Sequence, residues 1–463
     1  MPARRAASSL LHLEAVSKGY GSRTILHAVS CILLPGTLTL VAGPNGSGKS
    51  TLLRVMAGLS RPDSGTVAFD GSSGGMAYLG HETLLYPHLT ALENLAFWAA
   101  LHGMPTDDEA LLDTLDRMRL AAFADERAGS FSRGMAQRLS LARALSLCPS
   151  CLLLDEPLTG MDAASAKLVR ETVPQLKEQG TALVWVTHDP HTDGAMADAV
   201  LTLDGDGGYA FTAAPFTGIV PARHSGQHFG QPELSFFPAA LAIAAKDIKL
   251  LAGRGGALLQ ALLLGLLLIV LFGLGLGGSA DAARIGPTAA AAVFWLASAF
   301  CQTILMTALF GLEETNKARI GLLLSPVPSQ AVWLGKAIAG TLLLLAIQAV
   351  FLIASVVFLG QPWAGNIPLA LAAVPLVDIG MASLGALLGS IARGHTARES
   401  LCSLVVFPLL IPVLLAGIRA LSALYAPESA ADAARWLGFA AAFDAVFAAA
   451  ALFLFPVMFG GDD

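Results

Sequence analysis

The sequence has little charge, few cysteines and no basic excess. Asp, Glu, Lys and Arg make up 13% of the 463 residues, whereas 55% are hydrophobic and the mean hydropathy is +0.65. This composition excludes an ordinary soluble enzyme, and the chain is too long for one domain. Five cysteines exclude a disulfide scaffold. The net charge of −6, without a basic patch, argues against a nucleic-acid partner.

The charge is also unevenly distributed. Residues 1–233 carry 17 Lys and Arg against 23 Asp and Glu, and the remainder carries 11 of each. The start, MPARRAASSLLHLEAV, is basic, but its apolar run is short and is broken by His12 and Glu14, so no signal peptide is expected. We therefore expect the first domain to stay in the cytoplasm.

The segment VAGPNGSGKST predicts a phosphate-binding loop. Residues 43–50 fit G-x-x-x-x-G-K-[ST] between a strand-like GTLTLVAG and a helix-like STLLRVMAGL, which is the context that the motif requires. In such a loop Lys49 reaches the β- and γ-phosphates, and the Ser50 hydroxyl ligates Mg²⁺. The predicted ATP-binding residues of the loop are Gly43, Pro44, Asn45, Gly46, Ser47, Gly48, Lys49, Ser50 and Thr51.

The segment CLLLDEPLTGMD predicts a buried strand with Asp155 and Glu156 at its end. Ligands of open α/β sheets bind where strands end. We expect Asp155 to hold Mg²⁺ and Glu156 to polarise the attacking water. The segment LVWVTHD predicts a further strand that ends at His188. Beside the other two motifs, a catalytic histidine that contacts a γ-phosphate is favoured there over an ordinary surface histidine.

The segment FSRGMAQRLSLARAL resembles the signature loop and helix of the ABC-transporter ATPases. With Tyr20 in SKGYGSRTIL, the resemblance covers residues 10–205 and implies an α/β P-loop ABC ATPase domain over 1–205. It implies that Tyr20 stacks on adenine. It also implies that Ser132 and Gly134 bind the ATP of an opposite subunit, and that Asp162 lies in the loop that couples the two sites.

Three residues depart from the family pattern. Arg133 and Met135 replace the usual Gly and Gln of the signature. His81, in AYLGHETLLYP, stands where most relatives have a Gln that senses Mg²⁺ and the membrane domain. Imidazole can donate or accept one hydrogen bond, so we expect His81 to keep a catalytic role with a different geometry.

The second half of the chain predicts an all-α transmembrane domain with six spans over 234–463. Residues 206–233 are rich in Gly and Pro, which is typical of a linker. The segment FFPAALAIAAKDIKLLAGR looks amphipathic and is expected either along the cytoplasmic face or as an extension of the first span. The stretches long enough to cross a bilayer are 256–277, 288–310, 331–359, 366–391, 400–425 and 436–459.

The loops between these stretches predict the orientation. The loops at 311–330 and 392–399 carry Lys317, Arg319, Arg393 and Arg398, whereas the other loops have at most one Arg each. Basic loops stay in the cytoplasm. We therefore expect a multi-pass protein of the inner (cytoplasmic) membrane, with the ATPase domain and both termini in the cytoplasm.

The segment EETNKARIGLLLSPVPSQAVWLGK, residues 313–336, is a polar interruption between two spans. We predict that it lies in water on the ATPase side and that Glu313 and Glu314 couple ATP binding to the membrane domain. A bare connection is the alternative, although a bare connection could be far shorter. The segment also resembles the loop of the CcmB membrane subunit of cytochrome c maturation, and MAYLGHETLLYPHLTALENLAFW resembles its CcmA partner. The chain thus resembles CcmA fused to CcmB.

This resemblance implies ATP hydrolysis that drives haem export or releases a haem-loaded chaperone. The implied cofactors are ATP and Mg²⁺, and the implied partners are CcmC-, CcmD- and haem-chaperone-type proteins. A homodimer of the fused chain is expected, because one chain has one P-loop and one signature. An ABC-2 type exporter of polysaccharide or drug is the alternative. An ABC protein that acts on ribosomes or DNA is disfavoured by the six spans.

We expect haem to be cargo that this chain does not ligate. Its membrane half has one histidine, His395, and its methionines and cysteines are scattered over different spans. These residues are Met306, Met381, Met458, Cys301 and Cys402.

Five polar residues interrupt the predicted spans: Gln302, Gln348, Asp378, Arg419 and Asp444. They form either a functional polar path or subunit-binding patch, or ordinary interhelical hydrogen bonds. An ion pair of Arg419 with Asp378 or Asp444 is possible.

Overall fold

The computed structural model describes residues 9–70, 75–213, 236–276, 285–365, 367–390, 396–426 and 430–460. The chain divides into two compact units. The first consists of residues 1–234 with 315–326, and the second of residues 235–314 with 327–462. Among the described residues, the first unit has strands and helices and the second only helices, so the predicted fold class is confirmed.

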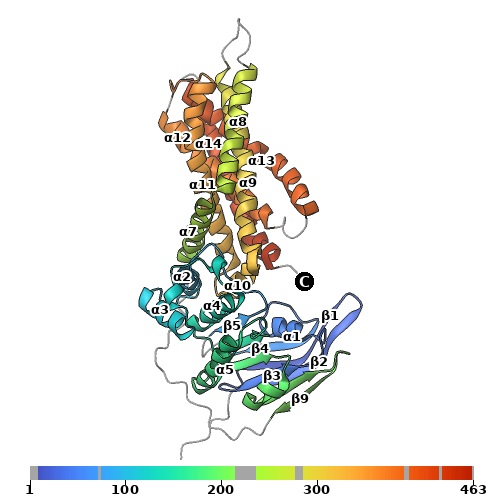
Figure 1. Cartoon of the computed structure of the whole chain (residues 1–463). Coiled ribbons are helices and arrows are strands. Elements are labelled where there is room, and N and C mark those ends of the chain that lie inside the picture. Colours follow the sequence, from blue (N-terminus) through green and yellow to red (C-terminus); the bar gives the residue numbers. More distant parts are fainter. Residues whose placement is uncertain are drawn as a thin grey trace, which may run out of the picture. The chain divides into compact units, whose positions relative to one another are not determined.

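A six-stranded sheet forms the centre of the first unit (Figure 1). Its central strands are short apolar runs with every residue buried, as expected for a parallel sheet covered on both faces. Five strands are parallel, and β9 is antiparallel to β8. In spatial order the strands are β5 Met76–Leu79, β6 Cys151–Asp155, β7 Ala182–Val186, β3 Leu38–Ala42, β8 Ala199–Leu203 and β9 Tyr209–Ala213.

An antiparallel sheet and six α-helices complete the main part of this unit. The sheet has the order β2-β1-β4, with β1 Leu11–Tyr20, β2 Arg23–Leu33 and β4 Ser64–Phe69. The helices are α1 Lys49–Met56, α2 Ala91–Leu101, α3 Asp108–Arg117, α4 Arg133–Ser146, α5 Ala163–Glu178 and α6 Pro190–Asp193. Two apolar clusters of buried side chains hold these elements together.

The start of the predicted linker differs from the structure. Residues 206–208 form the turn of a β-hairpin that leads into β9. Gly205 and Gly207 both have a φ of 93°, and Asp204 Oδ1 accepts the N–H groups of Asp206 and Gly208 at 2.9 Å each. The glycines there satisfy a turn that needs positive φ and do not mark a flexible connection. Residues 209–213 of the predicted linker form β9, and residues 214–233 lie outside the described residues.

Part of the segment between spans 2 and 3 belongs to the first unit. Residues 315–326 include the 3-10 turn η5 Thr315–Lys317 and helix α10 Ala318–Leu324. Asn316 and Lys317 have φ of 52° and 51°, so a left-handed turn precedes α10.

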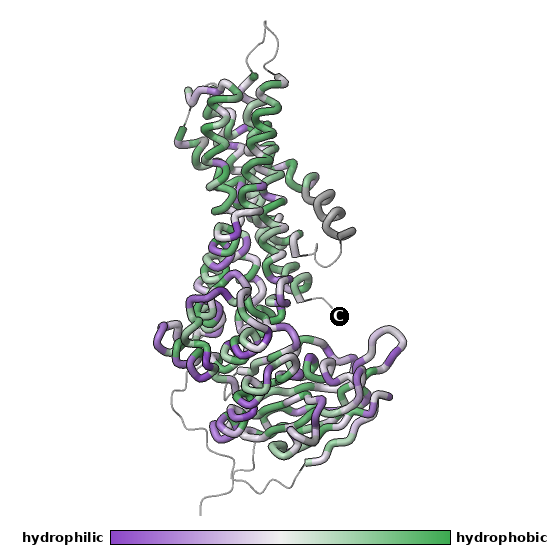
Figure 2. The backbone as a smooth tube through the Cα atoms, in the orientation of Figure 1, coloured by the Kyte–Doolittle hydropathy of each residue, from purple (hydrophilic) through white to green (hydrophobic). Residues whose placement is uncertain are grey.

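The described residues of the second unit form seven helices, and Figure 2 shows apolar residues along most of their length. Six candidate spans lie within the described residues, at 256–275, 287–324, 329–358, 367–389, 407–425 and 434–460. The predicted number of spans is therefore confirmed. The helices are α7 Phe236–Arg254, α8 Gly256–Leu276, α9 Pro287–Glu314, α11 Ser329–Phe358, α12 Ile367–Gly389, α13 Thr396–Tyr425 and α14 Ala430–Gly460.

Helix α7 buries two of the charged residues that the amphipathic prediction placed in water, whereas Lys249 is exposed as predicted. Lys246 is 5% exposed and Asp247 is fully buried. The helix packs closely on α11, where a Cβ added at Gly335 would lie 2.7 Å from the Ala240 carbonyl oxygen. The buried charges find partners on α9 and α11, far away in sequence, which no local pattern could reveal.

Candidate active site

The phosphate-binding loop links β3 to α1. Gly43, Gly46 and Gly48 have φ of 146°, 79° and 96°, values that residues with a side chain rarely adopt. A Cβ added at Gly48 would lie 2.6 Å from Ile25 Cγ2, so a glycine is needed there for space as well. The loop therefore presents backbone N–H groups at the N-terminus of α1, where a helix favours anions.

Lys49 and Ser47 have side chains suited to phosphate. The Lys49 ammonium donates to the carbonyl oxygens of Gly43 at 2.9 Å and Pro44 at 3.0 Å, and the residue is 6% exposed. The Ser47 hydroxyl is buried without a hydrogen-bond partner among the described residues. Buried polar groups need partners, so a free hydroxyl beside a lysine and a glycine loop fits a bound triphosphate.

Ser50 and Asp155 meet at the end of β6, as their prediction as Mg²⁺ ligands requires. The Ser50 hydroxyl donates to Asp155 Oδ1 at 3.1 Å, and the Tyr78 hydroxyl donates to Oδ2 at 3.3 Å. Burial raises the pKa of Asp155, although the hydrogen bond from Ser50 partly opposes this shift. A bound divalent cation would offset the desolvation of the carboxylate, and hydroxyl and carboxylate oxygens are the donors that Mg²⁺ prefers.

Glu156 lies between two histidines. Its Oε1 is 2.5 Å from His188 Nε2, and its Oε2 is 3.8 Å from His81 Nε2. The Thr159 hydroxyl donates to Oε2 at 3.3 Å. The φ of Glu156 is 52°, a strained conformation of the kind found at functional sites. The structure thus brings together all three residues predicted as catalytic.

Ser132, Gly134 and Asp162 form a second group. Ser132 caps the N-terminus of α4, and Asp162 caps α5. A Cβ added at Gly134 would lie 3.5 Å from Asp162 Oδ1. The pKa of Asp162 is lowered, and the largest cause is its hydrogen bonding with Ser165. In the part of the chain that the structure describes, Ser132 and Asp162 form no hydrogen bond with Lys49 or Asp155.

Tyr20, predicted to stack on adenine, is 42% exposed at the end of β1, with Lys18 Nζ 5.4 Å from its ring centre. The sequence interpretation missed Tyr78 and Thr159. Tyr78 lies on β5, next to the strand of Asp155, and only the pairing of β5 with β6 brings the two together. Thr159 follows Glu156 by three residues, so a local turn could have indicated its contact.

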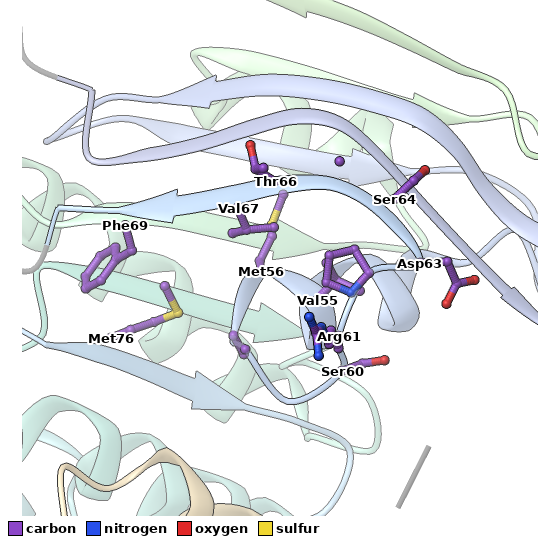
Figure 3. Close-up of a pocket in the computed structure, with 14 residues that line it drawn as sticks. Val55, Met56, Ser60, Arg61, Asp63, Ser64, Thr66, Val67, Phe69 and Met76 are labelled. Carbon is purple, nitrogen blue, oxygen red and sulfur yellow. The ribbon is translucent and has the colours of Figure 1, made fainter. Parts of the chain in front are cut away.

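A separate cavity of about 840 Å³ lies at the C-terminal end of α1 (Figure 3). Its lining includes Val55 and Met56 from the end of that helix and Phe69 from β4. Lys49 begins the same helix, so this cavity is at the end away from the phosphate-binding loop.

The segment 315–326 packs onto the loop that follows His81. The Leu84 N–H donates to the Asn316 carbonyl oxygen, and the Asn316 side chain donates to the Leu85 carbonyl oxygen, both at 3.2 Å. A Cβ added at Gly321 of α10 would lie 2.9 Å from Trp98 Cζ3. The two hydrogen bonds of Asn316 and the close packing of Gly321 therefore hold η5 and α10 within the first unit.

Glu313 and Glu314, the predicted coupling residues, have unequal environments. Glu314 is exposed, but Glu313 is 3% exposed at the end of α9. Its carboxylate accepts from Lys246 at 2.7 Å and from Lys336 at 2.6 Å. The prediction that this end of the segment lies in water is therefore wrong for Glu313, since two distant lysines compensate its charge. Asn316 and Gly321, from the same segment, make contacts within the first unit, and the coupling role of the glutamates stays a prediction.

Comparison with known proteins divides the chain in the same way. Residues 26–159 match the family model described as ABC transporter, and residues 238–459 match that of the CcmB protein. The chain is similar to the uncharacterized ABC transporter ATP-binding protein YdbJ of Bacillus subtilis, with 35% identity over 192 residues. That match covers 39% of this chain and 62% of the relative.

A second relative is the probable sulfate/thiosulfate import ATP-binding protein CysA of Chlorella vulgaris. It is 36% identical over 203 residues, which cover 42% of this chain and 86% of that protein. A solved ATP-binding subunit of an ABC transporter is 26% identical and has a TM-score of 0.41, over 44% of this chain and 90% of that chain.

Proposed function

This chain belongs to the ABC transporter family and carries a CcmB domain behind its ATPase, and from this premise we propose that it acts in cytochrome c maturation. ATP hydrolysis would drive haem export or the release of a haem-loaded chaperone. The observation that carries the proposal is the CcmB match over residues 238–459, which includes all the helices of the second unit.

The residues of the active site explain how the ABC ATPase hydrolyses ATP. The phosphate-binding loop binds the phosphates, and Lys49 exchanges its contacts with the loop carbonyls for phosphate oxygens. Glu156 orients the attacking water, and His188, held at 2.5 Å from Oε1, fixes the direction of the carboxylate. Mg²⁺, when bound by Ser50 and Asp155, would neutralise negative charge on the phosphates.

The loop from His81 to Leu85 connects this chemistry to α10. His81 lies beside Glu156 at one end of the loop, and Leu84 and Leu85 bind Asn316 at the other. A movement of the loop with the state of the nucleotide would therefore move η5 and α10. This is the route by which hydrolysis would act on the membrane helices.

The working unit in this proposal is a homodimer. One chain holds one phosphate-binding loop and one signature, and Ser132 and Gly134 would complete the ATP site of the partner copy. Native mass spectrometry of the detergent-solubilised Glu156→Gln variant with ATP should give two copies of the chain. Full ATPase activity of a preparation that contains only single copies would contradict the proposal.

Haem would be held by partner proteins of the CcmC, CcmD or haem-chaperone type. Cys301 donates to the Ala261 carbonyl oxygen at 3.0 Å, and Met306 is packed against Gly340. His395 lies outside the described residues. Titration of the purified chain with haem should give no sharp low-spin spectrum. A tight low-spin complex that is lost on mutating one of these residues would make the chain itself a haem conduit.

The proposal is tested by purifying the chain from its native membrane with the proteins that co-elute and recording a haem spectrum. A haem-containing partner that dissociates on ATP addition, but not with Glu156→Gln, is expected. A haem-free preparation whose ATPase is stimulated by a polysaccharide or drug would favour the alternative of an ABC-2 type exporter.

A further inference from the structure

A buried polar cluster joins three helices of the second unit. Gln348 on α11 donates its amide to Asp378 Oδ1 on α12 at 2.9 Å and to Ser298 Oγ on α9 at 3.1 Å. Ser298 in turn donates to the Phe294 carbonyl oxygen at 2.9 Å, so its oxygen is the acceptor for Gln348. Ser298 and Asp378 are 0% exposed, and Gln348 is 1% exposed. The cluster thus lies wholly inside a bundle of candidate membrane spans.

Several polar atoms of this cluster, and of Gln302 next to it, lack a hydrogen-bond partner among the described residues. Asp378 Oδ2 and Gln348 Oε1 form no hydrogen bond with any described residue. Gln302, one turn along α9 from Ser298, is 2% exposed, and neither its amide oxygen nor its nitrogen has a partner in the described ranges. Its Nε2 lies 3.4 Å from where a Cβ on Gly385 would be, two turns along α12 from Asp378. Buried unpaired polar groups are costly, so each calls for a physical explanation such as a bound proton, water or ion.

No cation compensates Asp378 among the described side chains. Helix α12 packs on α9, α11, α13 and α14. On α9 Glu313 is bound by lysines, and on α11 Lys336 binds Asp247 and Glu313. Arg419 on α13 is exposed, so the pairs of Arg419 with Asp378 or Asp444 that the sequence left possible are not formed.

The remaining charged groups on the neighbouring helices form no ion pair with Asp378 in the part of the chain that the structure describes. Glu314 on α9 is exposed, and Arg435 lies near the start of α14. Asp444 on α14 lies against Gly380, two residues from Asp378, and both of its oxygens lack partners in the described part of the chain. Positions two apart on a helix point to nearly opposite sides, so Asp444 lies on a different side of α12 from Asp378.

Asp247 is a second buried carboxyl group of the same unit and offers a comparison. It is also 0% exposed, but Lys246 lies 2.7 Å from Oδ1 and Lys336 lies 3.2 Å from Oδ2. Two buried carboxyl groups of one unit therefore have opposite surroundings. Asp247 has two lysines beside it, whereas Asp378 has one amide, which also binds a serine.

We propose that Asp378 binds a proton, so that the second unit contains a proton-binding site between α9, α11 and α12. The proton makes Oδ2 a hydrogen-bond donor. The amide oxygens of Gln348 and Gln302, which lack hydrogen-bond partners among the described residues, are potential acceptors between the same helices. Gln348 is a positioning residue that orients the carboxyl through Oδ1. Loss of the proton would leave a buried charge without a cation, so proton occupancy controls how tightly α12 packs on α9 and α11. The proposal does not depend on the nature of the cargo.

The test is labelling of the full chain in lipid nanodiscs with dicyclohexylcarbodiimide, which adds to protonated carboxyl groups in apolar surroundings. The acid proton moves to a carbodiimide nitrogen as the carboxyl oxygen bonds to the central carbon, and the adduct rearranges to an acylurea. Mass spectrometry should locate the adduct on Asp378 and show its loss as the pH is raised. Asp247 is the matched control and should stay unlabelled, because Lys246 and Lys336 lie against its two carboxylate oxygens.

Three variants test whether Asp378 carries the proton, and added Na⁺ tests whether the site binds a metal ion instead. Asp378→Asn should lose the adduct at this position, keep the thermal stability of the wild type, and lose an infrared band of a protonated carboxyl group. Gln348→Leu should retain labelling to higher pH, because the amide donor favours the ionised form. Asp247→Asn should be destabilised. Absence of the infrared band together with an unlabelled Asp378 would overturn the proposal. Protection by Na⁺ at constant pH would also overturn it and would assign a sodium ion to the site.

Discussion

Replacing Glu313 by Gln should destabilise the second unit strongly. Glu313, Asp247, Lys246 and Lys336 form a cluster of two acids and two bases, each 5% exposed or less. The substitution keeps the shape of the side chain but leaves two buried lysines facing one carboxylate. Removing one member of a buried ion pair costs about 3–5 kcal/mol, and we expect the lower end because Asp247 still contacts both lysines.

Such a loss is large enough to measure in a unit of this size. A change of about 3 kcal/mol lowers the melting temperature by roughly 6–12 °C. The reporter is Cys301, which is fully buried and reacts with a maleimide only when the second unit opens. Mass spectrometry of the Cys301 peptide after labelling at increasing temperature gives the melting curve in detergent.

Two variants separate charge burial from other effects. Glu314→Gln alters an exposed neighbour of the same type and should leave the curve unchanged. Glu313→Gln with Lys246→Met restores neutrality and keeps the contact of Lys336 with Asp247, so it should recover most of the loss. An unchanged curve for Glu313→Gln, or no recovery in the double variant, would refute the reasoning. Glu313→Gln and Glu314→Gln together also test coupling, because of the two only Glu314→Gln can change transport without changing stability.

The remaining predictions concern the first unit. Glu156→Gln should retain nucleotide binding and lose hydrolysis, whereas Lys49→Ala should weaken binding itself; equilibrium binding and phosphate release distinguish the two. Gly321→Leu should cost about 1–3 kcal/mol in the packing of α10 against Trp98, and should change the ratio of cargo-stimulated to basal ATPase activity, with basal hydrolysis intact. Burial lowers the pKa of His102 to about 4, so its contribution to stability is present above pH 6.5 and is lost as the pH falls toward 4. The melting temperature of His102→Gln should therefore fall less over this range than that of the wild type, and parallel curves would contradict the assignment.

The active site was largely predictable because its motifs are local. A phosphate-binding loop, a strand that ends in two acids and a strand that ends in a histidine are each contiguous, and a parallel sheet brings the ends of its strands to one edge. The strain at Glu156 and its distances to His81 and His188 could not be predicted, because they depend on backbone angles and on the register of neighbouring strands.

The sequence by itself determined the α/β domain, the six spans and the resemblance to CcmA and CcmB, since composition and contiguous motifs carry that information. Only the tertiary structure decided what the charges between and inside the spans do. Lys336 and Asp247 are 89 residues apart, and Gln348 and Asp378 are 30 apart, yet both pairs are in contact. A lone Lys, Asp or Glu in a sequence is typical of a solvated surface. Its burial becomes favourable only where the packing of separate helices supplies the opposite charge. At Asp378 no opposite charge is supplied by the described residues, and in our proposal a bound proton neutralises the carboxyl group.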